Sequence, residues 1–306
     1  MYDSVNFWVD RADMAGGNPF DILPYLSEIT EKRSESGGYS CTGTVRGYSV
    51  CALQSGVSVN GSLAKFFFDG ENVSTMTRRA TQEAISNLGD VLHIDMKRAK
   101  VVRADIATVI PTKFQPAYYY GYLGDKVHFK RLQADADTLY YNNHQRVLIF
   151  YDKGKEAAGN MPDVLKDDSL FRYELRFIRR VSAQMKTDVR GETLYNPSFY
   201  EKIVMRWYDE FRTIRKIKKQ NVMTKQIETV RDAETALFAH LLQQAGHGII
   251  DNFIDDLKME KKFKNRERYS ELKRKLNTIY ASLKGEPSEL GEELEKWIYE
   301  QAKYAR

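Results

Sequence analysis

The sequence is poor in cysteine and histidine, and this excludes several kinds of site. Its two cysteines, Cys41 and Cys51, have no partners of the zinc-site type, and in a reducing compartment we expect two free thiols. The five histidines show neither His-x-His nor His-x-x-x-His spacing, so nothing supports a two-histidine metal site.

Long apolar runs and nucleotide-binding loops are also missing. No run approaches the roughly 20 residues that span a bilayer, and Met1–Asp10 lacks the pattern of a signal peptide, so we expect a cytoplasmic protein with no membrane contact. There is no Gly-rich loop ending in Lys-Ser/Thr, no Gly-x-Ser-x-Gly and no dinucleotide fingerprint. An ATPase or helicase therefore has no motif in its favour. The net charge of +5 suits a polyanionic partner without requiring one.

The chain has enough apolar residues to form the cores of one or two folded domains, because 42% of its residues are hydrophobic and 12% are aromatic. Residues with strand patterns dominate the first two thirds, most clearly Arg146–Lys153 and Leu170–Ile178. From Phe199 onward the apolar spacing is helical. We therefore predict an α+β fold, with an antiparallel-sheet domain over residues 1–198 and a helical C-terminal region over residues 199–306.

The same patterns predict the remaining elements. The other expected strands are Ser4–Val9, Thr42–Ser55, Ser58–Phe68, Lys100–Ile110, Tyr118–Leu123, Val127–Leu132 and Thr138–Tyr141. The expected helices are a short one within Asn18–Thr30, then Asn72–Asn87 with Thr75 as its N-cap, Phe199–Ile217, Arg231–Ala245, Ile249–Lys262, Asn265–Leu283 and Ser288–Ala305. Glu31–Tyr39 is expected to be a polar connector, and Pro111 to end the strand before it.

Two predicted strands carry charged residues in apolar surroundings. Asp105 lies two residues after Arg103, and a carboxylate there is costly to bury unless it is ion-paired or bound to a metal. Glu174 shares one strand face with Arg172 and Arg176. An ion-pair ladder, a bound cation or a phosphate backbone would each account for that face.

A third segment, Tyr151-Asp-Lys153-x-x-Glu156, ends the clearest strand. An unperturbed tyrosine has a pKa of about 10 and is a poor nucleophile at neutral pH. A lysine or metal ion nearby favours the phenolate, and a carboxylate can accept the phenol proton. The alternative is a polar turn at the end of a surface strand.

Aromatic and basic stretches have two interpretations each. Tyr118–Tyr122 and Tyr140-Tyr141 either stack on unpaired bases or pack on a half-buried sheet. A predicted basic helical stretch either contacts the backbone of duplex DNA or is a solvated helix face. It comprises Arg212, Arg215, Lys216, Lys218 and Lys219.

Taken in order, these segments resemble the filamentous-phage replication initiators of the II/X type, and the related rolling-circle plasmid initiators that lack the two-histidine motif. The matching segments are Val102–Ile106 (Arg-x-Asp), Tyr151–Glu156 (Tyr-x-Lys-x-x-Glu), Phe171–Arg176 (Arg-aromatic-Glu), Gly61–Phe66 (Gly-Ser-Leu-x-Lys-Phe) and the start, Met1–Val5. The resemblance covers residues 1–200. It departs from the plasmid initiators at Ile149, where they often carry an arginine.

The resemblance implies sequence-specific nicking and joining of one DNA strand. Tyr151 would attack the scissile phosphate and leave a 5′-phosphotyrosine and a free 3′-hydroxyl. Asp105 and Glu174 would hold Mg²⁺ or Mn²⁺, with Glu156 as a third carboxylate or a proton acceptor. Lys153 would lower the pKa of the phenol or contact the phosphate.

The expected partner is DNA at a replication origin, as a single strand or a hairpin. A host helicase and a second copy of the chain stay open as further partners. The basic side chains expected to contact DNA are Lys65, Arg103, Arg172, Arg176, Arg215 and Lys218. The rival functions are a mobilisation relaxase, a non-catalytic DNA-binding replication or copy-control protein, and an unrelated α+β enzyme.

Overall fold

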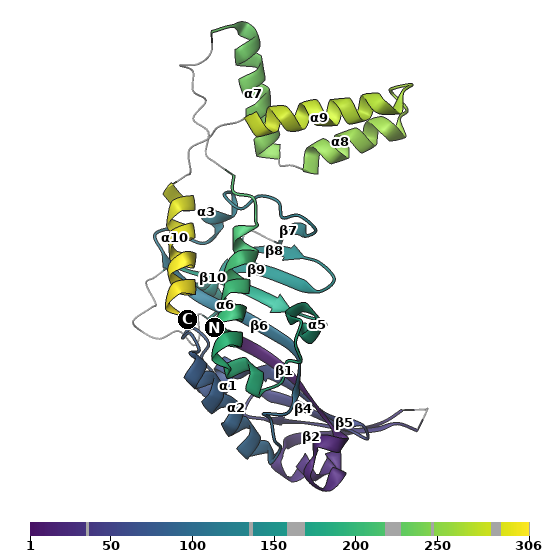
Figure 1. Ribbon diagram of the computed structural model, residues 1–306, viewed down its shortest axis with the longest axis vertical. Helices are drawn as coiled ribbons and strands as arrows, with labels where there is room; N and C mark the ends of the chain where they lie inside the picture. The colour runs from purple at the N-terminus through teal and green to yellow at the C-terminus, as the bar shows by residue number, and fades with distance from the viewer. Residues whose placement is uncertain are drawn as a thin grey trace. The chain divides into compact units, whose positions relative to one another are not determined.

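The computed structural model describes residues 1–34, 37–134, 137–157, 169–217, 228–245, 248–282 and 289–305. Within these ranges the chain forms one sheet of ten strands and a set of helices that lie mostly in its later part (Figure 1). Every strand pairing in the sheet is antiparallel. The predicted α+β class with an antiparallel sheet is therefore confirmed.

The middle of the sheet is made of strands from distant parts of the sequence. The strands are β1 (Tyr2–Asp10), β2 (Ser27–Arg33), β3 (Tyr39–Val45), β4 (Tyr48–Leu53), β5 (Gly56–Ser62), β6 (Lys100–Thr112), β7 (Lys130–Ala134), β8 (Thr138–Asn142), β9 (Arg146–Asp152) and β10 (Ser169–Phe177). Their order across the sheet is β2-β3-β4-β5-β1-β6-β10-β9-β8-β7. Strand β10 therefore lies between β6 and β9, and β1 lies beside β6.

The helices range from single turns to four or more turns. They are α1 (Leu63–Phe67), α2 (Arg78–Leu92), α3 (Ala117–Tyr120), α4 (Lys153–Glu156), α5 (Val181–Met185), α6 (Pro197–Arg212), α7 (Val230–Ala245), α8 (Gly248–Met259), α9 (Arg266–Ser282) and α10 (Glu289–Tyr304). Short 3-10 helices include η3 (Pro19–Tyr25) and η5 (Glu192–Tyr195). In the described part of the chain, no helix combines the length and the apolar character needed to span a membrane.

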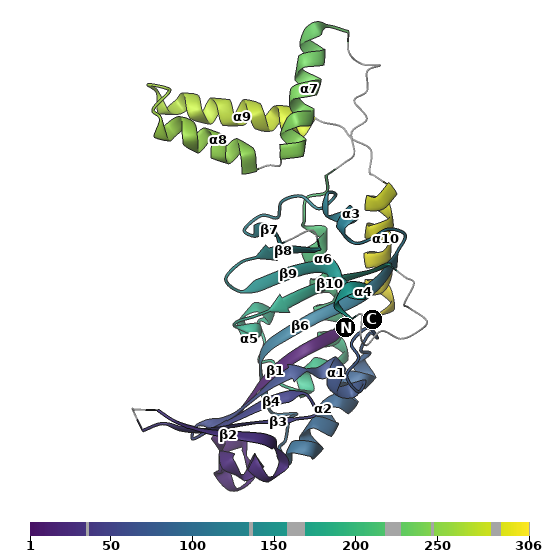
Figure 2. The ribbon, with the colours of Figure 1, turned by 180° about the vertical axis from the view of Figure 1, so that it is seen from behind.

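Strict alternation along β10 divides its side chains between the two faces of the sheet. Tyr173 and Leu175 are fully buried on the face that packs against α6. The Tyr173 hydroxyl donates to the carbonyl of Trp207 at 3.0 Å, and its ring stacks on Phe150 with centroids 4.7 Å apart. Figure 1 shows α6 lying in front of the strands on this side. In Figure 2, seen from behind, β6, β10 and β9 lie in front of α6 and present the opposite face, called the open face below.

The end of α10 packs on the same side of the sheet as α6. Thr108 of β6 donates a hydrogen bond to Gln301 at 3.2 Å, and the rings of Tyr208 and Tyr299 meet with centroids 5.9 Å apart. Since Thr108 is directly opposite Tyr173 in the register, both side chains belong to the face under α6. Helices from the C-terminal third thus supply part of the sheet's apolar cover.

Contacts divide the chain into two compact units that are interleaved in sequence. The first comprises residues 1–117, 128–212 and 297–306 and contains the whole sheet, and the second comprises residues 118–127 and 213–296. In the second unit α8 and α9 pack through Ile250, Ile254, Tyr269 and Leu276. The division predicted between residues 198 and 199 falls within α6, a helix of the first unit. Whether it separates catalytic from other functions stays a prediction.

Several predicted elements in the first part of the chain differ from the structure. The single strand predicted over Thr42–Ser55 is wrong, because Arg46 and Gly47, with φ of 44° and 83°, form a two-residue hairpin turn between β3 and β4. The predicted connector Glu31–Tyr39 begins inside β2, which extends to Arg33. Helix α2 starts later than expected, because Thr77 rather than Thr75 accepts the capping hydrogen bond, from the Ala80 amide at 3.1 Å.

Two further predictions are wrong for reasons of tertiary packing. Pro111 does not end β6 but pairs with Leu170. The register of β1 reaches only to Ile106, so the end of β6 is paired on one side, where proline is tolerated. The strand predicted over Tyr118–Leu123 is a short helix, α3, followed by a turn. Burial of the Tyr119 and Tyr120 rings outweighs the strand preference of tyrosine.

The stacked ring of Phe150 gives a test of the core between the sheet and α6. Phe150→Ala should lower the free energy of unfolding by about 3–5 kcal/mol, because the ring is fully buried and leaves a cavity. Phe114→Ala is the matched control, since that ring is 51% exposed and should cost less than about 1 kcal/mol. Urea unfolding measures both. Equal losses for the two variants would contradict the assigned core.

Candidate functional site

The three charged segments of the sequence meet on the open face of the sheet. In the register of β10, Arg176 is directly opposite Asp105 of β6, and Arg172 is directly opposite Tyr151 of β9. Directly opposed residues of antiparallel strands share a face. Alternation places Glu174 on the same face as its two arginine neighbours. With Arg103, which pairs with Asp105 from the same strand, the structure therefore gathers six of the predicted site residues on three adjacent strands.

Asp105 and Glu174 form a pair of buried carboxylates, each 1% exposed. The Nε of Arg176 donates to Glu174 at 2.6 Å and lies 3.7 Å from the Asp105 carboxylate, so both acids flank one nitrogen. Arg103 donates twice to Asp105, at 3.0 and 2.6 Å. The ion-pair ladder considered from the sequence is thus present, and it brings the two proposed metal ligands together.

Burial acts against ionisation of Asp105 even though two arginines contact it. Burial raises the pKa of Asp105 to about 6, and the neighbouring charge of Glu174 adds to the effect, whereas Arg103 and Arg176 oppose it. A positive charge beside a buried carboxylate favours its ionised form, so a cation here would act in the same direction as Arg103 and Arg176. Mg²⁺ is usually held by one or two carboxylates together with substrate phosphates, so the pair fits such an ion.

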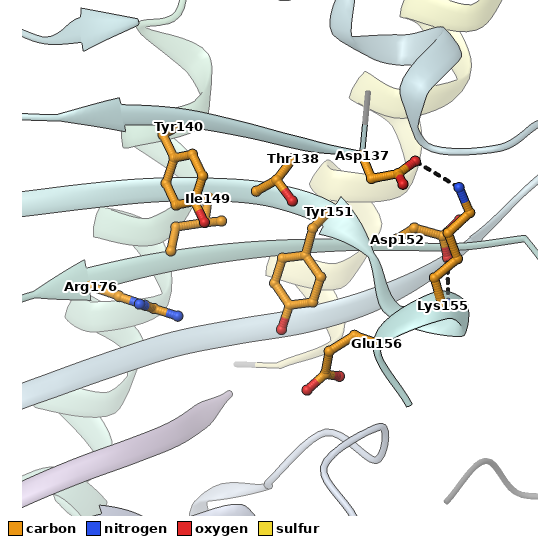
Figure 3. A pocket seen from close by; sticks show the side chains of 9 residues that line it. All are labelled: Asp137, Thr138, Tyr140, Ile149, Tyr151, Asp152, Lys155, Glu156 and Arg176. Carbon is orange, nitrogen blue, oxygen red and sulfur yellow. Dashed lines mark hydrogen bonds and ion pairs between the residues drawn. The ribbon is translucent and has the colours of Figure 1, made fainter. Parts of the chain in front are cut away.

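No third acid joins this pair within the ranges that the structure describes. Among these residues, no three histidine, cysteine, aspartate or glutamate side chains are grouped so that they could hold a metal ion. Glu156, considered as the third carboxylate, instead accepts a hydrogen bond from the ammonium of Lys153. Figure 3 shows Glu156 on one side of Tyr151 and Arg176 on the other. Its position beside the phenol suits the alternative role, acceptance of a proton.

Arg172 is a buried arginine with internal partners on several sides. Its guanidinium lies 2.9 Å from the carboxylate of Asp3, donates to the backbone carbonyl of Asn72 at 2.6 Å and lies 3.6 Å from Glu174. The guanidinium carbon is 5.9 Å from the ring centroid of Tyr151, within range of a cation–π contact. Arg172 is 1% exposed, so its contacts are made inside the protein, whereas Arg103 and Arg176 are each 34% exposed.

Asp3 and Asn72 are site residues that sequence reasoning missed. Burial acts to raise the pKa of Asp3, but the charge of Arg172 and the hydrogen bonds from Asn72 and Arg172 outweigh it and lower the pKa. Asp3 could have been found by the signal that marked Asp105, a carboxylate within an apolar strand. Asn72 lies in the segment before α2, and its sequence neighbourhood carries no such signal.

Asn72 connects the two buried cations of the site. Its side-chain oxygen accepts from the Lys153 ammonium at 2.6 Å, its side-chain nitrogen donates to Asp3 at 3.1 Å, and its backbone carbonyl accepts from Arg172. Lys153 is 1% exposed, and burial lowers its pKa. The ammonium of Lys153 is therefore held by Asn72 and Glu156. Its predicted action on the phenol stays a prediction.

Tyr151 is half-buried at the edge of a cavity of about 440 Å³ (Figure 3). Burial raises the pKa of Tyr151 above its usual range, and the nearby guanidinium of Arg172 acts in the opposite direction. The phenol is therefore protonated in the protein alone at neutral pH. To act as a nucleophile it must lose its proton to an acceptor, and Glu156 lines the same cavity.

The remaining predicted contact residues are dispersed. Lys65 is exposed on α1, which follows β5. Helix α6 ends at Arg212, so the predicted basic helix does not extend to Arg215, which is half-buried in the second unit. Burial also lowers the pKa of Lys216 to about 8. Lys218 and Lys219 lie outside the described residues.

Comparison of the chain with models of known protein families and with curated protein sequences finds no match. The likeness to phage and plasmid initiators therefore stays a resemblance carried by short motifs.

The pKa of Asp105 predicts an unusual dependence of stability on pH. Its folded-state pKa of about 6 exceeds the value of about 3.9 in an unfolded chain, so the folded state binds the proton more tightly. The contribution of this group to stability should fall by about 2 kcal/mol as pH rises from about 4 to about 6. Asp105→Asn should lack that slope. Urea unfolding with a chelator present measures the difference, and parallel pH profiles for both proteins would contradict the prediction.

Asn72→Ala tests the connection between the buried cations. The change removes one of the two acceptors of the buried Lys153 ammonium and the amide that donates to Asp3, and we expect a loss of about 1–3 kcal/mol in the free energy of unfolding. Asn60→Ala is the control, because Asn60 is half-buried on β5 and donates to Ser58 at 2.8 Å. It should cost no more than about 1 kcal/mol. A cost for Asn72→Ala no larger than that of the control would show that Glu156 alone satisfies the Lys153 ammonium.

Proposed function

We propose that this protein is a rolling-circle replication initiator of a phage or plasmid, which nicks and rejoins one DNA strand through Tyr151. The observation that carries the proposal is the meeting of a phenol, a buried carboxylate pair and arginines on one sheet face, from three separate chain segments. Each of these groups has a use in transfer of a phosphodiester to tyrosine.

Binding of the scissile phosphate is assigned to the exposed part of the arginine ladder. Arg176 is one third exposed and lines the same cavity as Tyr151. A guanidinium binds phosphate oxygens in two-point geometry, and it can offset negative charge that develops on them. Buried Arg172 instead orients the ring of Tyr151 from beneath and favours its ionised form.

The reaction exchanges one phosphate ester for another. The phenol oxygen of Tyr151 bonds to phosphorus while the bond from phosphorus to the 3′-oxygen breaks, which leaves a 5′-phosphotyrosine and a 3′-hydroxyl. The phenol proton passes to the Glu156 carboxylate, and a proton is returned to the leaving 3′-oxygen. Because the tyrosine ester retains the energy of the phosphodiester, attack by a 3′-hydroxyl reverses the step and rejoins the strand.

A divalent cation, Mg²⁺ or Mn²⁺, held by Asp105 and Glu174 would supply positive charge beside the phosphoryl oxygens. Its support is geometric: the two buried carboxylates flank the same nitrogen of Arg176, and carboxylate oxygens are the ligands that Mg²⁺ prefers. Arg103 and Arg176 keep these two side chains in place before any cation binds.

A nicking assay tests the proposal. Protein incubated with single-stranded DNA of its own replicon and Mn²⁺ should form a covalent protein–DNA adduct that survives a denaturing gel. Tyr151→Phe should abolish the adduct, because it removes the nucleophilic oxygen and keeps the ring. A chelator and Glu174→Gln should each reduce it strongly, because they remove the cation or one of its ligands.

Tyr304→Phe is the control for this assay, since Tyr304 is 76% exposed on α10, and it should leave the adduct unchanged. An adduct that persists in Tyr151→Phe would refute the assigned nucleophile. Tight DNA binding without any adduct would favour a non-catalytic replication or copy-control protein. A relaxase would form the same adduct but with the transfer origin of a mobile element.

A further inference from the structure

We propose that Tyr140, Ile149 and Leu132 form a stacking subsite for one unpaired nucleobase of a DNA strand, beside Tyr151. The inference rests on the proposed function in taking DNA as the ligand. It goes further by stating which part of the DNA lies against which side chains. It also assigns a role to Tyr140, a residue that the proposed reaction does not use.

The register of the last three strands creates an apolar stripe on the open face. Tyr140 of β8 is directly opposite Ile149 of β9 on one side and Leu132 of β7 on the other. Ile149 is 3% exposed and Leu132 is 48% exposed, while Tyr140 is half-buried. The stripe lies next to the charged ladder, since Ile149 is also directly opposite Glu174.

Alternation along β8 explains why Tyr140 is available and its neighbour is not. Tyr141 points to the opposite face, is fully buried and packs edge-on against Phe150 with centroids 6.0 Å apart. Of the two adjacent tyrosines, one therefore belongs to the core and the other to the open face. The two interpretations made from the sequence, stacking and core packing, apply to different residues of the same pair.

Tyr140 is close enough to Tyr151 for both side chains to contact the same nucleotide. Thr138 is directly opposite Tyr151, so Tyr140 is its diagonal neighbour across the two strands, and such pairs lie about 7–8 Å apart. Both tyrosines line the cavity of about 440 Å³ shown in Figure 3, with Ile149 beside Tyr140. A phosphate held at Tyr151 and Arg176 thus places an adjoining base at the ring of Tyr140.

The chemistry of the subsite distinguishes unpaired from paired DNA but does not distinguish one base sequence from another. An aromatic ring stacks on any base, because every base has a π-face. A base can lie on Tyr140 only after it has left the stack of a duplex, which costs free energy unless the strand is already single. The subsite therefore favours single-stranded or melted DNA at the point of cleavage.

The test measures binding in a protein that cannot cleave. In full-length Tyr151→Phe protein, Tyr140→Ala should weaken binding of a labelled, mixed-sequence single-stranded oligonucleotide on the order of tenfold. Tyr140→Leu, which keeps an apolar side chain without a π-face, should bind as weakly as Tyr140→Ala. Tyr140→Phe should bind like its parent, and so should the control Tyr304→Ala. Binding of the same sequence as a duplex should change little.

Each other result counts against the subsite. Parental affinity in Tyr140→Ala or Tyr140→Leu shows that the ring does not stack on DNA. Weak binding by Tyr140→Phe would show that the hydroxyl of Tyr140, rather than its ring, binds the DNA. A covalent adduct formed at Tyr140 would show that this hydroxyl reacts with the DNA. Thermal unfolding of all variants separates loss of binding from loss of folding. Since binding requires no reaction, failure of the nicking assay would overturn the proposed function and leave this result interpretable.

Discussion

The guanidinium of Arg172 lies buried between Asp3, Asn72 and the ring of Tyr151, and the rest of the site is arranged around it. A buried charge is tolerated only with well-placed partners, and removing one partner is costly. These partners come from β1, from the segment before α2 and from β9, which are far apart in sequence. The ion pair with Asp3 thus joins the first strand to the middle of the sheet, and Arg172 contacts the ring proposed to react.

Three carboxylates and three guanidinium groups meet on this part of the open face. The carboxylates belong to Asp3, Asp105 and Glu174, and the guanidinium groups to Arg103, Arg172 and Arg176. The charge of Arg172 and the hydrogen bonds to Asp3 lower the pKa of Asp3, whereas burial raises that of Asp105. The ionised form is therefore favoured at Asp3 and disfavoured at Asp105.

The two faces of the sheet serve different purposes because strand side chains alternate. Tyr173, Phe150 and Tyr141 build the core under α6, and their neighbours in sequence, including Tyr140 and Tyr151, line the open face. The core fixes the register, and the register decides which polar side chains become cross-strand neighbours. Adjacent residues in the chain therefore differ completely in role, as the pairs Tyr140–Tyr141 and Phe150–Tyr151 illustrate.

The sequence by itself determined the fold class, the two clearest strands, the main C-terminal helices and the segments that carry Asp105, Tyr151 and Glu174, because local alternation and buried charge are properties of neighbouring residues. It also indicated Asp105 and Glu174 as site carboxylates without showing that both flank the same nitrogen of Arg176. Only the tertiary structure decided that β10 lies between β6 and β9, that Lys153 is held by Asn72, and that Asp3 supports Arg172. It likewise kept Pro111 within a strand and folded the residues after Pro116 as a helix. These outcomes depend on contacts between residues far apart in the chain, and such contacts leave no periodic signal in the sequence around either partner.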